Sequence, residues 1–274
     1  MGDLLITVAP TGAETTKDAC PQLPTTLAEL VETAQRCEAA GAAMVHVHIR
    51  DDEHRPTLDG QRLADTVAAL HESTDLVVQL STGGSVHDPL ETRLKVLDAQ
   101  PDSCSLTMGT TNFGDDVFLN PWPFVRDLYQ LSQERRVVPE FELFDLGQVA
   151  ALHRLLDLHG LPWGGKVHVD LVMGVPGGMP GTADALVAAV AALPARTTSW
   201  AATGIGRSTL AVGLASLSKG GHLRVGMEDV LTLSRGVPVE HNEQLVARAV
   251  EMGRLAQRMP MTGDEARSLL GIPA

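Results

Sequence analysis

Two histidines, His46 and His48, stand one residue apart in the stretch MVHVHIRDD. The valines and isoleucine around them are typical of a buried strand. Side chains two residues apart lie on the same face of a strand, so both imidazoles would point to one side. Neutral imidazole nitrogens are common metal ligands. We therefore interpret the pair as half of a metal site, with two hydrogen-bonded core histidines as the alternative.

A third ligand is available in the stretch LRVGMEDV, which contains the adjacent carboxylates Glu228 and Asp229. Two histidines and one carboxylate would leave coordination positions open, which is typical of catalytic rather than structural metal sites. Nitrogen and oxygen donors suit Zn²⁺, and they would also accept Fe²⁺, Mn²⁺ or Co²⁺. The alternative role for the two carboxylates is to cap the helix that follows.

Three more charged residues fall inside expected strands. Arg224 lies four residues before Glu228, and a buried guanidinium is costly unless it is paired. We expect Asp229 to be its partner, so that the pair orients a base or holds a carboxylate, or forms a simple salt bridge. Glu140 and Glu142 share one strand face in PEFELF. One of them could support a ligand histidine, or both could face outward and pair with a cation.

Short loops rich in glycine or hydroxyl groups follow several strands. In QLSTGGS, Gly83 and Gly84 allow a turn whose N–H groups would face an anion. TGIGRS opens a helix, where backbone amides and Arg207 could bind a phosphate. TGAET carries Glu14, which is either a site for a cationic substrate group or a solvated loop residue.

These residues need a scaffold, and apolar β-rich runs alternate with helix-period segments along the chain. Strands are expected at residues 4–9, 44–50, 75–81, 103–108, 137–144, 166–173, 197–203 and 223–226. Helices are expected at residues 26–40, 145–159, 208–219 and 241–259. Eight strands alternating with helices predict a closed (β/α)8 TIM barrel rather than an open sheet. No G-x-G-x-x-G follows the first strand, which also argues against a dinucleotide-binding fold.

The barrel prediction explains how distant residues could meet. Barrel enzymes carry their chemistry at the carboxyl ends of the strands. Closure places strand eight beside strand one, so Glu228 can reach His46 and His48 across the mouth. We expect residues 1–274 to form a single catalytic domain with a short C-terminal helical tail. The tail, MTGDEARSLLGIPA, is a candidate for packing on a neighbouring subunit.

Composition limits the class of protein. The chain has 274 residues, 44% of them hydrophobic, and a net charge of −13, which argues against nucleic acid as a partner. Three cysteines without metal-ligand spacing fit a reducing compartment. The N-terminus lacks a signal-peptide pattern, and no apolar run is long enough for a membrane span. We therefore expect a cytoplasmic protein with no membrane partner.

The motifs together resemble the β-keto acid cleavage enzymes. The stretches that carry the resemblance are TGAETT, HVHIRDD, STGG, GTTNFGDD, PEFELFD, GVPGGM, ATGIGR and GHLRVGMEDV. They occur in order along nearly the whole chain, one at the end of each expected strand. Within the family, the likeness is nearest to the 3-keto-5-aminohexanoate cleavage enzymes of lysine fermentation.

The resemblance implies a (β/α)8 barrel, usually assembled as a homotetramer, with one Zn²⁺ per subunit. It implies that a β-keto acid and the co-substrate acetyl-CoA give acetoacetate and a new acyl-CoA. The implied zinc ligands are His46, His48 and Glu228. The implied catalytic residues are Asp229 as base, Arg224 as its partner and Glu142 as a supporting acid. The implied substrate contacts are Ser81, Gly84 and Ser105, with Glu14 at the position that holds a substrate amino group.

In this interpretation Zn²⁺ chelates and polarises the β-keto acid. Deprotonated acetyl-CoA, or its equivalent, would attack the keto carbon, and Arg207 would lie near the phosphates of coenzyme A.

Two other functions remain open from the sequence. One is another metal-dependent barrel enzyme, such as an aldolase-type lyase or an amidohydrolase that needs no CoA. An amidohydrolase would use histidines on strands five and six, and His168 fits strand six whereas strand five offers only glutamates. The other is a metal-stabilised binding protein, which would leave the desolvation cost of the mouth-facing polar groups unexplained.

Overall fold

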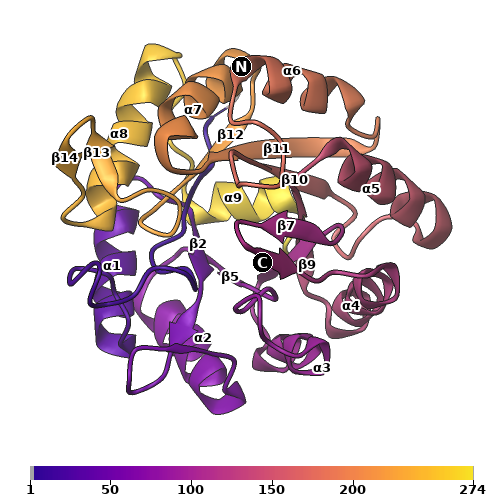
Figure 1. Cartoon of the computed structure of the whole chain (residues 1–274), viewed down its shortest axis with the longest axis horizontal. Coiled ribbons are helices and arrows are strands. Elements are labelled where there is room, and N and C mark those ends of the chain that lie inside the picture. Colours follow the sequence, from indigo (N-terminus) through magenta and orange to yellow (C-terminus); the bar gives the residue numbers. More distant parts are fainter. Residues whose placement is uncertain (1–2, 274) are drawn as a thin grey trace.

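The computed structural model describes residues 3–273, and its centre is a closed barrel of parallel strands ringed by helices (Figure 1). The barrel strands are β1 (Ile6–Val8), β2 (Met44–Val47), β5 (Val77–Leu80), β6 (Ser103–Thr107), β9 (Val138–Leu143), β10 (Val167–Met173), β11 (Thr197–Gly204) and β12 (His222–Val225). β12 pairs with β1 in parallel, with Thr7 opposite Arg224, and this pairing closes the ring. The predicted (β/α)8 barrel is therefore confirmed.

Helices cover the outside of the barrel (Figure 1). They are α1 (Leu27–Ala40), α2 (Gly60–Ser73), α3 (Leu90–Leu94), α4 (Trp122–Arg135), α5 (Leu146–His159), α6 (Ala183–Ala192), α7 (Thr209–Ser218) and α8 (Asn242–Leu255), with short 3-10 turns η1 (Lys95–Ala99) and η2 (Gly206–Ser208). Of these helices, α1, α5, α7 and α8 were expected from the sequence, and the bounds of the others were not predicted. Within residues 3–273, no helix combines the length and the apolar character needed to cross a bilayer.

The start of α1 shows why the expected helices form where they do. Thr26 is the N-cap, its hydroxyl accepts from the backbone N–H of Glu29, and the Glu29 carboxylate accepts from the N–H of Thr26 in return. This capping box satisfies backbone donors that would otherwise lack partners. Leu30, Ala34 and Cys37 then form the buried face that packs on the barrel.

The second strand is shorter than predicted. β2 ends at Val47, and Ile49–Arg50 form a separate strand, β3, that pairs with β4 (Pro56–Thr57) outside the barrel. Arg50 in β3 turns toward the loop after β1, where its guanidinium donates to the carbonyl oxygens of Gly12 and Thr15. His48 therefore lies just beyond the strand end rather than within the strand.

The C-terminal tail is helical, as predicted. It forms α9 (Gly263–Leu270), which lies across the ring of strands in Figure 1. Ala266 and Leu270 are buried in one cluster with residues at the amino ends of the strands, namely Leu5, Ala43, Met44 and Val77. One face of α9 is thus buried against the chain's own barrel at the amino ends of the strands, and packing of the tail on a neighbouring subunit stays a prediction.

A hairpin that was not predicted from the sequence lies at the carboxyl ends of the barrel strands. It consists of β7 (Thr111–Phe113) and β8 (Asp116–Phe118), joined by a two-residue turn at Gly114 and Asp115. The N–H of Gly114 donates to the carbonyl oxygen of Pro176 at 3.0 Å, which ties the turn to the loop after β10. A second hairpin, β13 (Thr232–Ser234) and β14 (Val237–Pro238), follows β12.

Candidate active site

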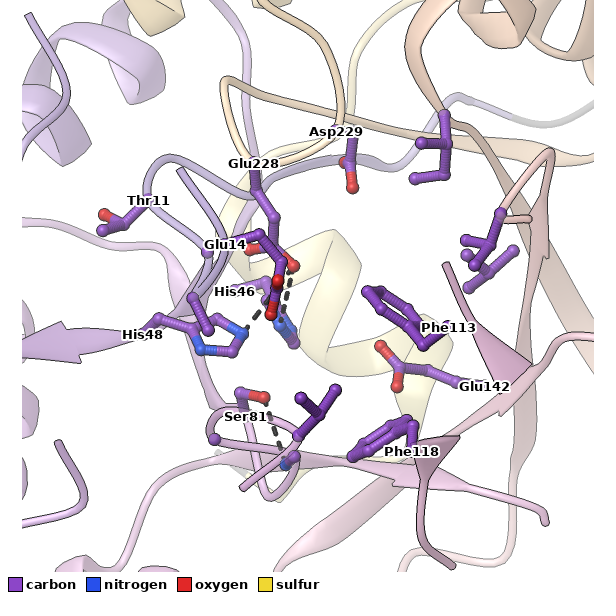
Figure 2. A pocket seen from close by; sticks show the side chains of 18 of the residues that line it. Thr11, Glu14, His46, His48, Ser81, Phe113, Phe118, Glu142, Glu228 and Asp229 are labelled. Carbon is purple, nitrogen blue, oxygen red and sulfur yellow. Dashed lines mark hydrogen bonds and ion pairs between the residues drawn. The ribbon is translucent and has the colours of Figure 1, made fainter. Parts of the chain in front are cut away.

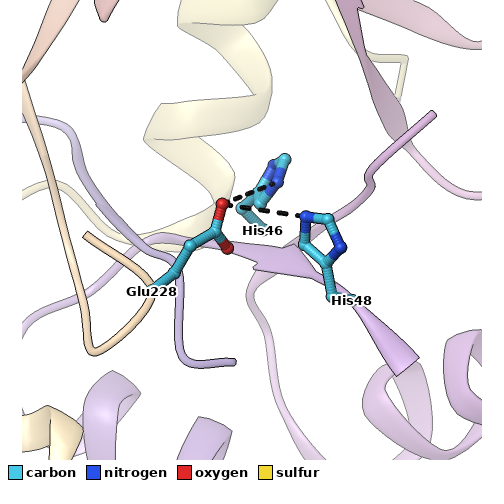
Figure 3. A group of neighbouring side chains, drawn as sticks. All are labelled: His46, His48 and Glu228. Carbon is cyan, nitrogen blue, oxygen red and sulfur yellow. Dashed lines mark ion pairs between the residues drawn. The ribbon is translucent and has the colours of Figure 1, made fainter. Parts of the chain in front are cut away.

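Three potential metal ligands converge at the carboxyl ends of β2 and β12 (Figure 3). The Nε2 atoms of His46 and His48 lie 3.8 Å and 3.7 Å from Oε1 of Glu228. One donor atom from each residue lies within 4.8 Å of the others, whereas donors at about 2.1 Å from a tetrahedral zinc ion lie roughly 3.4 Å apart, so the three side chains would move closer to share an ion. Barrel closure brings the three side chains together across the mouth, as the sequence analysis expected.

Gln79 determines which ring nitrogen of His46 faces this group. Its Oε1 lies 2.5 Å from Nδ1 of His46, and its Nε2 donates to Oγ of Ser103 at 3.2 Å. With a carbonyl oxygen as partner, Nδ1 carries the ring proton, and Nε2 keeps its lone pair for a metal. Burial and then the charge of Arg224 lower the pKa of His46 to about 4. Burial also lowers the pKa of His48, so both rings are neutral near pH 7.

Glu228 is held in place yet has a free oxygen. Its Oε1 accepts from Nη2 of Arg224 at 2.5 Å, whereas Oε2 is buried and has no hydrogen-bond donor among the described residues. Burial alone would raise the pKa of Glu228, but Arg224 and the two histidines lower it to about 2. Gly12 packs closely against the side chain of Glu228. A Cβ atom at position 12 would lie only 2.6 Å from Cγ of Glu228, so a larger residue would displace the carboxylate. An ionised, buried oxygen without a donor is a suitable metal ligand.

Arg224 joins three carboxylates. Its Nε and Nη2 donate to the two oxygens of Asp229 at 3.2 Å and 3.1 Å, and its Nη1 donates to Glu142 at 3.1 Å. Nη2 also reaches Glu228, as described above. The Arg224–Asp229 pair was expected from the sequence, but the bond to Glu142 on the opposite side of the barrel was not.

The charges of this network favour a divalent cation. Three carboxylates around one guanidinium leave a formal charge of −2 when all are ionised. Without a metal, burial raises the pKa of Asp229 to about 7 against the pull of Arg224, and burial also raises the pKa of Glu142. A divalent ion at His46, His48 and Glu228 would neutralise the network and favour ionised carboxylates.

Replacing Arg224 with methionine is expected to destabilise the metal-free fold by about 3–5 kcal/mol, since it leaves buried carboxylates without a counter-charge. Loss of the guanidinium would raise the folded-state pKa of all three carboxyl groups, including Glu228, whose pKa Arg224 now holds low, so the deficit should grow as the pH rises above about 4. Denaturant unfolding at pH 5 and pH 8 measures both effects.

Arg126→Met is the matched control, because Arg126 and Asp127 form an exposed pair that is worth about 1 kcal/mol at most. Equal unfolding free energies for the two variants would show that the Arg224 network does not stabilise the barrel.

A cavity of about 220 Å³ opens beside this network at the mouth of the barrel (Figure 2). It is lined by the expected site residues His46, His48, Glu228, Asp229, Arg224, Glu142, Glu14, Ser81 and Gly84. The hydroxyl of Ser81 accepts from the N–H of Gly83 at 3.2 Å and keeps its own proton for a ligand. Gly84 has φ +58°, and a Cβ there would lie 2.4 Å from Oδ2 of Asp88, so this turn requires glycine.

Two expected ligand-binding residues lie away from the cavity. Ser105 is fully buried under the loop that follows β5, where its hydroxyl accepts from the N–H of Thr82 at 3.3 Å. Arg207 is exposed in η2 and does not line the cavity. Ser105 does not line the cavity, so its contact with substrate stays a prediction.

The buried glutamate–histidine pair also differs from expectation. Glu140 lies 3.2 Å from Nε2 of His168, and Nδ1 of His168 lies 2.7 Å from the hydroxyl of Ser199. Glu140 therefore supports a core histidine, and Gln79 has the role beside His46 that we had assigned to a glutamate. Both nitrogens of His168 face these partners, so His168 does not join the metal-ligand group. The amidohydrolase alternative, which needs His168 as a metal ligand, is therefore not supported.

Aromatic side chains form the wall opposite the metal ligands, and the sequence analysis missed them. Phe113 and Phe118 come from the β7–β8 hairpin (Figure 2). Phe144, which follows β9, also lines the cavity. The signal was present in the stretch NFGDDVF, because a Gly-Asp pair between β-forming residues is typical of a two-residue hairpin turn.

Comparison with known proteins agrees with this geometry. Residues 3–272 match the family described as beta-keto acid cleavage enzyme. The chain is 35% identical to a 3-keto-5-aminohexanoate cleavage enzyme of Acetoanaerobium sticklandii, with 99% of each chain covered. It is 33% identical to a 3-oxoadipate:acetyl-CoA acetyltransferase of Cupriavidus necator, over 98% of this chain and 95% of that relative.

A solved structure supports the fold. The binary complex of ObcA with oxaloacetate matches with a TM-score of 0.78 at 20% identity, over 93% of this chain and 68% of that one. At this identity the likeness concerns the barrel alone. The family match, in contrast, extends over almost every residue and includes each strand end described above. We conclude that the chain belongs to the β-keto acid cleavage enzyme family.

Proposed function

We propose that this chain is a metal-dependent enzyme that converts a β-keto acid and acetyl-CoA into acetoacetate and a new acyl-CoA. The observation that carries the proposal is the convergence of His46, His48 and Glu228 beside the Arg224–Asp229 pair, inside one cavity. Family membership supports the same reaction, since one relative is named as an acetyl-CoA acetyltransferase of a keto acid.

A divalent metal held by the two histidines and Glu228 would polarise the keto group and offset the carboxylate charge of the substrate. The carbon between keto and carboxylate groups then becomes the most acidic carbon present. Asp229 lines the cavity with its carboxylate held by Arg224, so it is the base we assign to that proton. This differs from the attack by deprotonated acetyl-CoA considered from the sequence, and the reason is the greater acidity of the β-keto acid.

The remaining steps balance without any further reactant. Carbon 2 of the keto acid attacks the thioester carbonyl of acetyl-CoA, and coenzyme A leaves as its thiolate. The thiolate attacks the original keto carbon, the bond between carbons 2 and 3 breaks, and carbon 2 regains a proton. Asp229 takes up the proton at the start and can return it at the end.

The test uses acetyl-CoA labelled with ¹³C in both acetyl carbons. Purified protein of known metal content is incubated with it and a panel of β-keto acids, and the products are analysed by mass spectrometry. We expect both labelled carbons in acetoacetate, an unlabelled new acyl-CoA, and no product when acetyl-CoA is omitted. Cleavage of a keto acid without acetyl-CoA would instead support a CoA-independent lyase and reject the proposal.

The identity of the metal and the residues that contact substrate can also be proposed. We propose Zn²⁺ as the ion, since two imidazoles and one carboxylate suit it. We propose that Ser81 and the turn at Gly84 contact substrate, because both line the cavity. A homotetramer and a cytoplasmic location stay predictions.

Replacing Gln79 with methionine is expected to weaken metal binding by about 10–100-fold, because the ring of His46 loses the acceptor that orients it. Competition with a chromophoric chelator measures the affinity directly, without an activity assay. Gln35→Met on the exposed side of α1 is the control and should bind the metal as the unmodified protein does. Unchanged affinity in Gln79→Met would show that Gln79 does not orient a ligand.

A further inference from the structure

The cavity has two chemically different sides. Figure 2 shows His46, His48 and Glu228 on one side and Phe113 and Phe118 on the other. The chain contains five phenylalanines, and three of them, Phe113, Phe118 and Phe144, line this one cavity. So strong a concentration of a scarce residue type in one cavity points to an apolar ligand group.

The aromatic side is a continuous wall. Phe113 packs edge-to-face on Phe118 and on Phe144, with ring centroids 6.1 Å and 6.3 Å apart. Val172, Val175 and Ile205 extend the same surface, and Phe113, Phe144 and these three form one hydrophobic cluster. The rings contact one another along the wall instead of standing apart around a central space, so they do not form a cage for a cation.

Two charged side chains beside this wall, Glu142 and Arg93, already have hydrogen-bond partners. Glu142 accepts from Thr107 at 2.8 Å and from Arg224 at 3.1 Å, so each of its oxygens has a donor. Arg93 lies over the ring of Phe118, but its guanidinium donates to Thr82, Leu119 and Asn120. A charged substrate group placed against the wall would therefore lose its hydration without gaining a partner.

Glu14 is the competing feature, since it lines the cavity and could attract a cation. Its side chain is exposed, however, and an exposed ion pair contributes about 1 kcal/mol at most. Burying an apolar side chain contributes about 0.8 kcal/mol for each CH₂ group. A charged group on the wall would also lose its hydration, so a methyl group in the same position gains more from the wall than an ammonium group gains from Glu14.

We infer that the β-keto acid used by this chain has an uncharged, apolar side chain, which packs against Phe113, Phe118 and Phe144 while its keto acid end faces the metal ligands. This inference rests on the proposed function, and it assigns the substrate class within that function. Phe113 is then a specificity-determining residue, because it is the ring that contacts both of the others.

The test compares substrates that differ only in charge. One pair is 5-methyl-3-oxohexanoate and 5-amino-3-oxohexanoate, in which a methyl group replaces an ammonium. The other is 5,5-dimethyl-3-oxohexanoate and 3-oxo-4-(trimethylammonio)butanoate, in which carbon replaces the quaternary nitrogen. We expect kcat/KM to favour the uncharged member of each pair by at least about tenfold. Calorimetric binding of each acid to the zinc-loaded protein, without acetyl-CoA, gives a second readout with the same expected order.

Variants of Phe113 test whether this residue causes the preference for uncharged acids. Phe113→Ser should lower kcat/KM for the uncharged acids by about tenfold or more, raise their KM and leave the KM of acetyl-CoA unchanged, while Phe113→Leu should restore most of the loss. Val117→Ser is the matched control, because Val117 lies in the same hairpin with its side chain 47% exposed and outside the cavity lining.

The outcomes separate the inference from the proposed function. Turnover that favours the charged member of either pair, or a Phe113→Ser effect on the KM of acetyl-CoA alone, would overturn the inference and leave the proposed function standing. Tighter binding of the uncharged acids without any turnover would support the inference and overturn the proposed function. Binding of none of the four acids would overturn the inference as well.

Discussion

Removing the metal is expected to lower turnover by on the order of 10³-fold or more, and restoring Zn²⁺ should recover it. The physical reason is that the network around Arg224 has a formal charge of −2, and a substrate that brings its own carboxylate would add to it. Dialysis against a chelator, followed by metal analysis and the acetoacetate assay, measures the effect. A metal-free protein with the full rate would exclude a catalytic role for His46, His48 and Glu228.

Zinc uptake at pH 7 should also release protons. In the absence of a metal the pKa of Asp229 is about 7, so this carboxyl is partly protonated, and the charge of the ion would lower that pKa. Titration calorimetry in buffers of different ionisation enthalpy counts the released protons. The control is the double variant His46→Ala, His48→Ala, which should neither bind zinc in the cavity nor release protons.

Asp229→Asn is expected to lower kcat by about 10²–10⁴-fold, the usual contribution of a general base. The amide keeps the shape of the side chain and can still accept a hydrogen bond from Arg224, but it cannot take a proton. The unmodified enzyme should become faster as the pH rises through the pKa of Asp229, because only the ionised carboxylate is a base. With a divalent metal bound, that limb should lie below pH 7, and Asp229→Asn should remove it.

Asp116→Asn is the control for this experiment, since Asp116 is exposed on β8 near the mouth and does not line the cavity. It should keep both the rate and the pH profile. Turnover of Asp229→Asn within about tenfold of the unmodified enzyme would mean that another group removes the proton.

Local sequence patterns were enough to predict much of the fold. Each of the eight strands was expected within a few residues of its observed bounds, because buried parallel strands have continuous apolar runs that end in polar loops. The carboxyl ends of all strands meet at one face of a barrel, so His46, His48 and Glu228 could be placed together before any contact was known. Arg224 and Asp229 followed by the same reasoning.

Contacts between distant strands could not be derived in this way. Gln79 lies opposite His46 only through the register between β2 and β5, and Glu142 reaches Arg224 across the barrel interior. Glu140 and Glu142 look equivalent in PEFELF, yet one supports His168 and the other joins the Arg224 network. Which partner a buried polar group selects depends on side-chain geometry among neighbouring strands, which no local pattern encodes.

The sequence by itself therefore determined the barrel, its family and the residue types at the strand ends. Only the tertiary structure decided that α9 packs on the amino ends of the barrel strands and that Ser105 is buried beside Thr82. It also decided that the β7–β8 hairpin contributes two phenylalanines to the cavity wall. The physical reason is that strand and helix periodicity are local properties, whereas the walls of a cavity are formed by segments far apart in the chain.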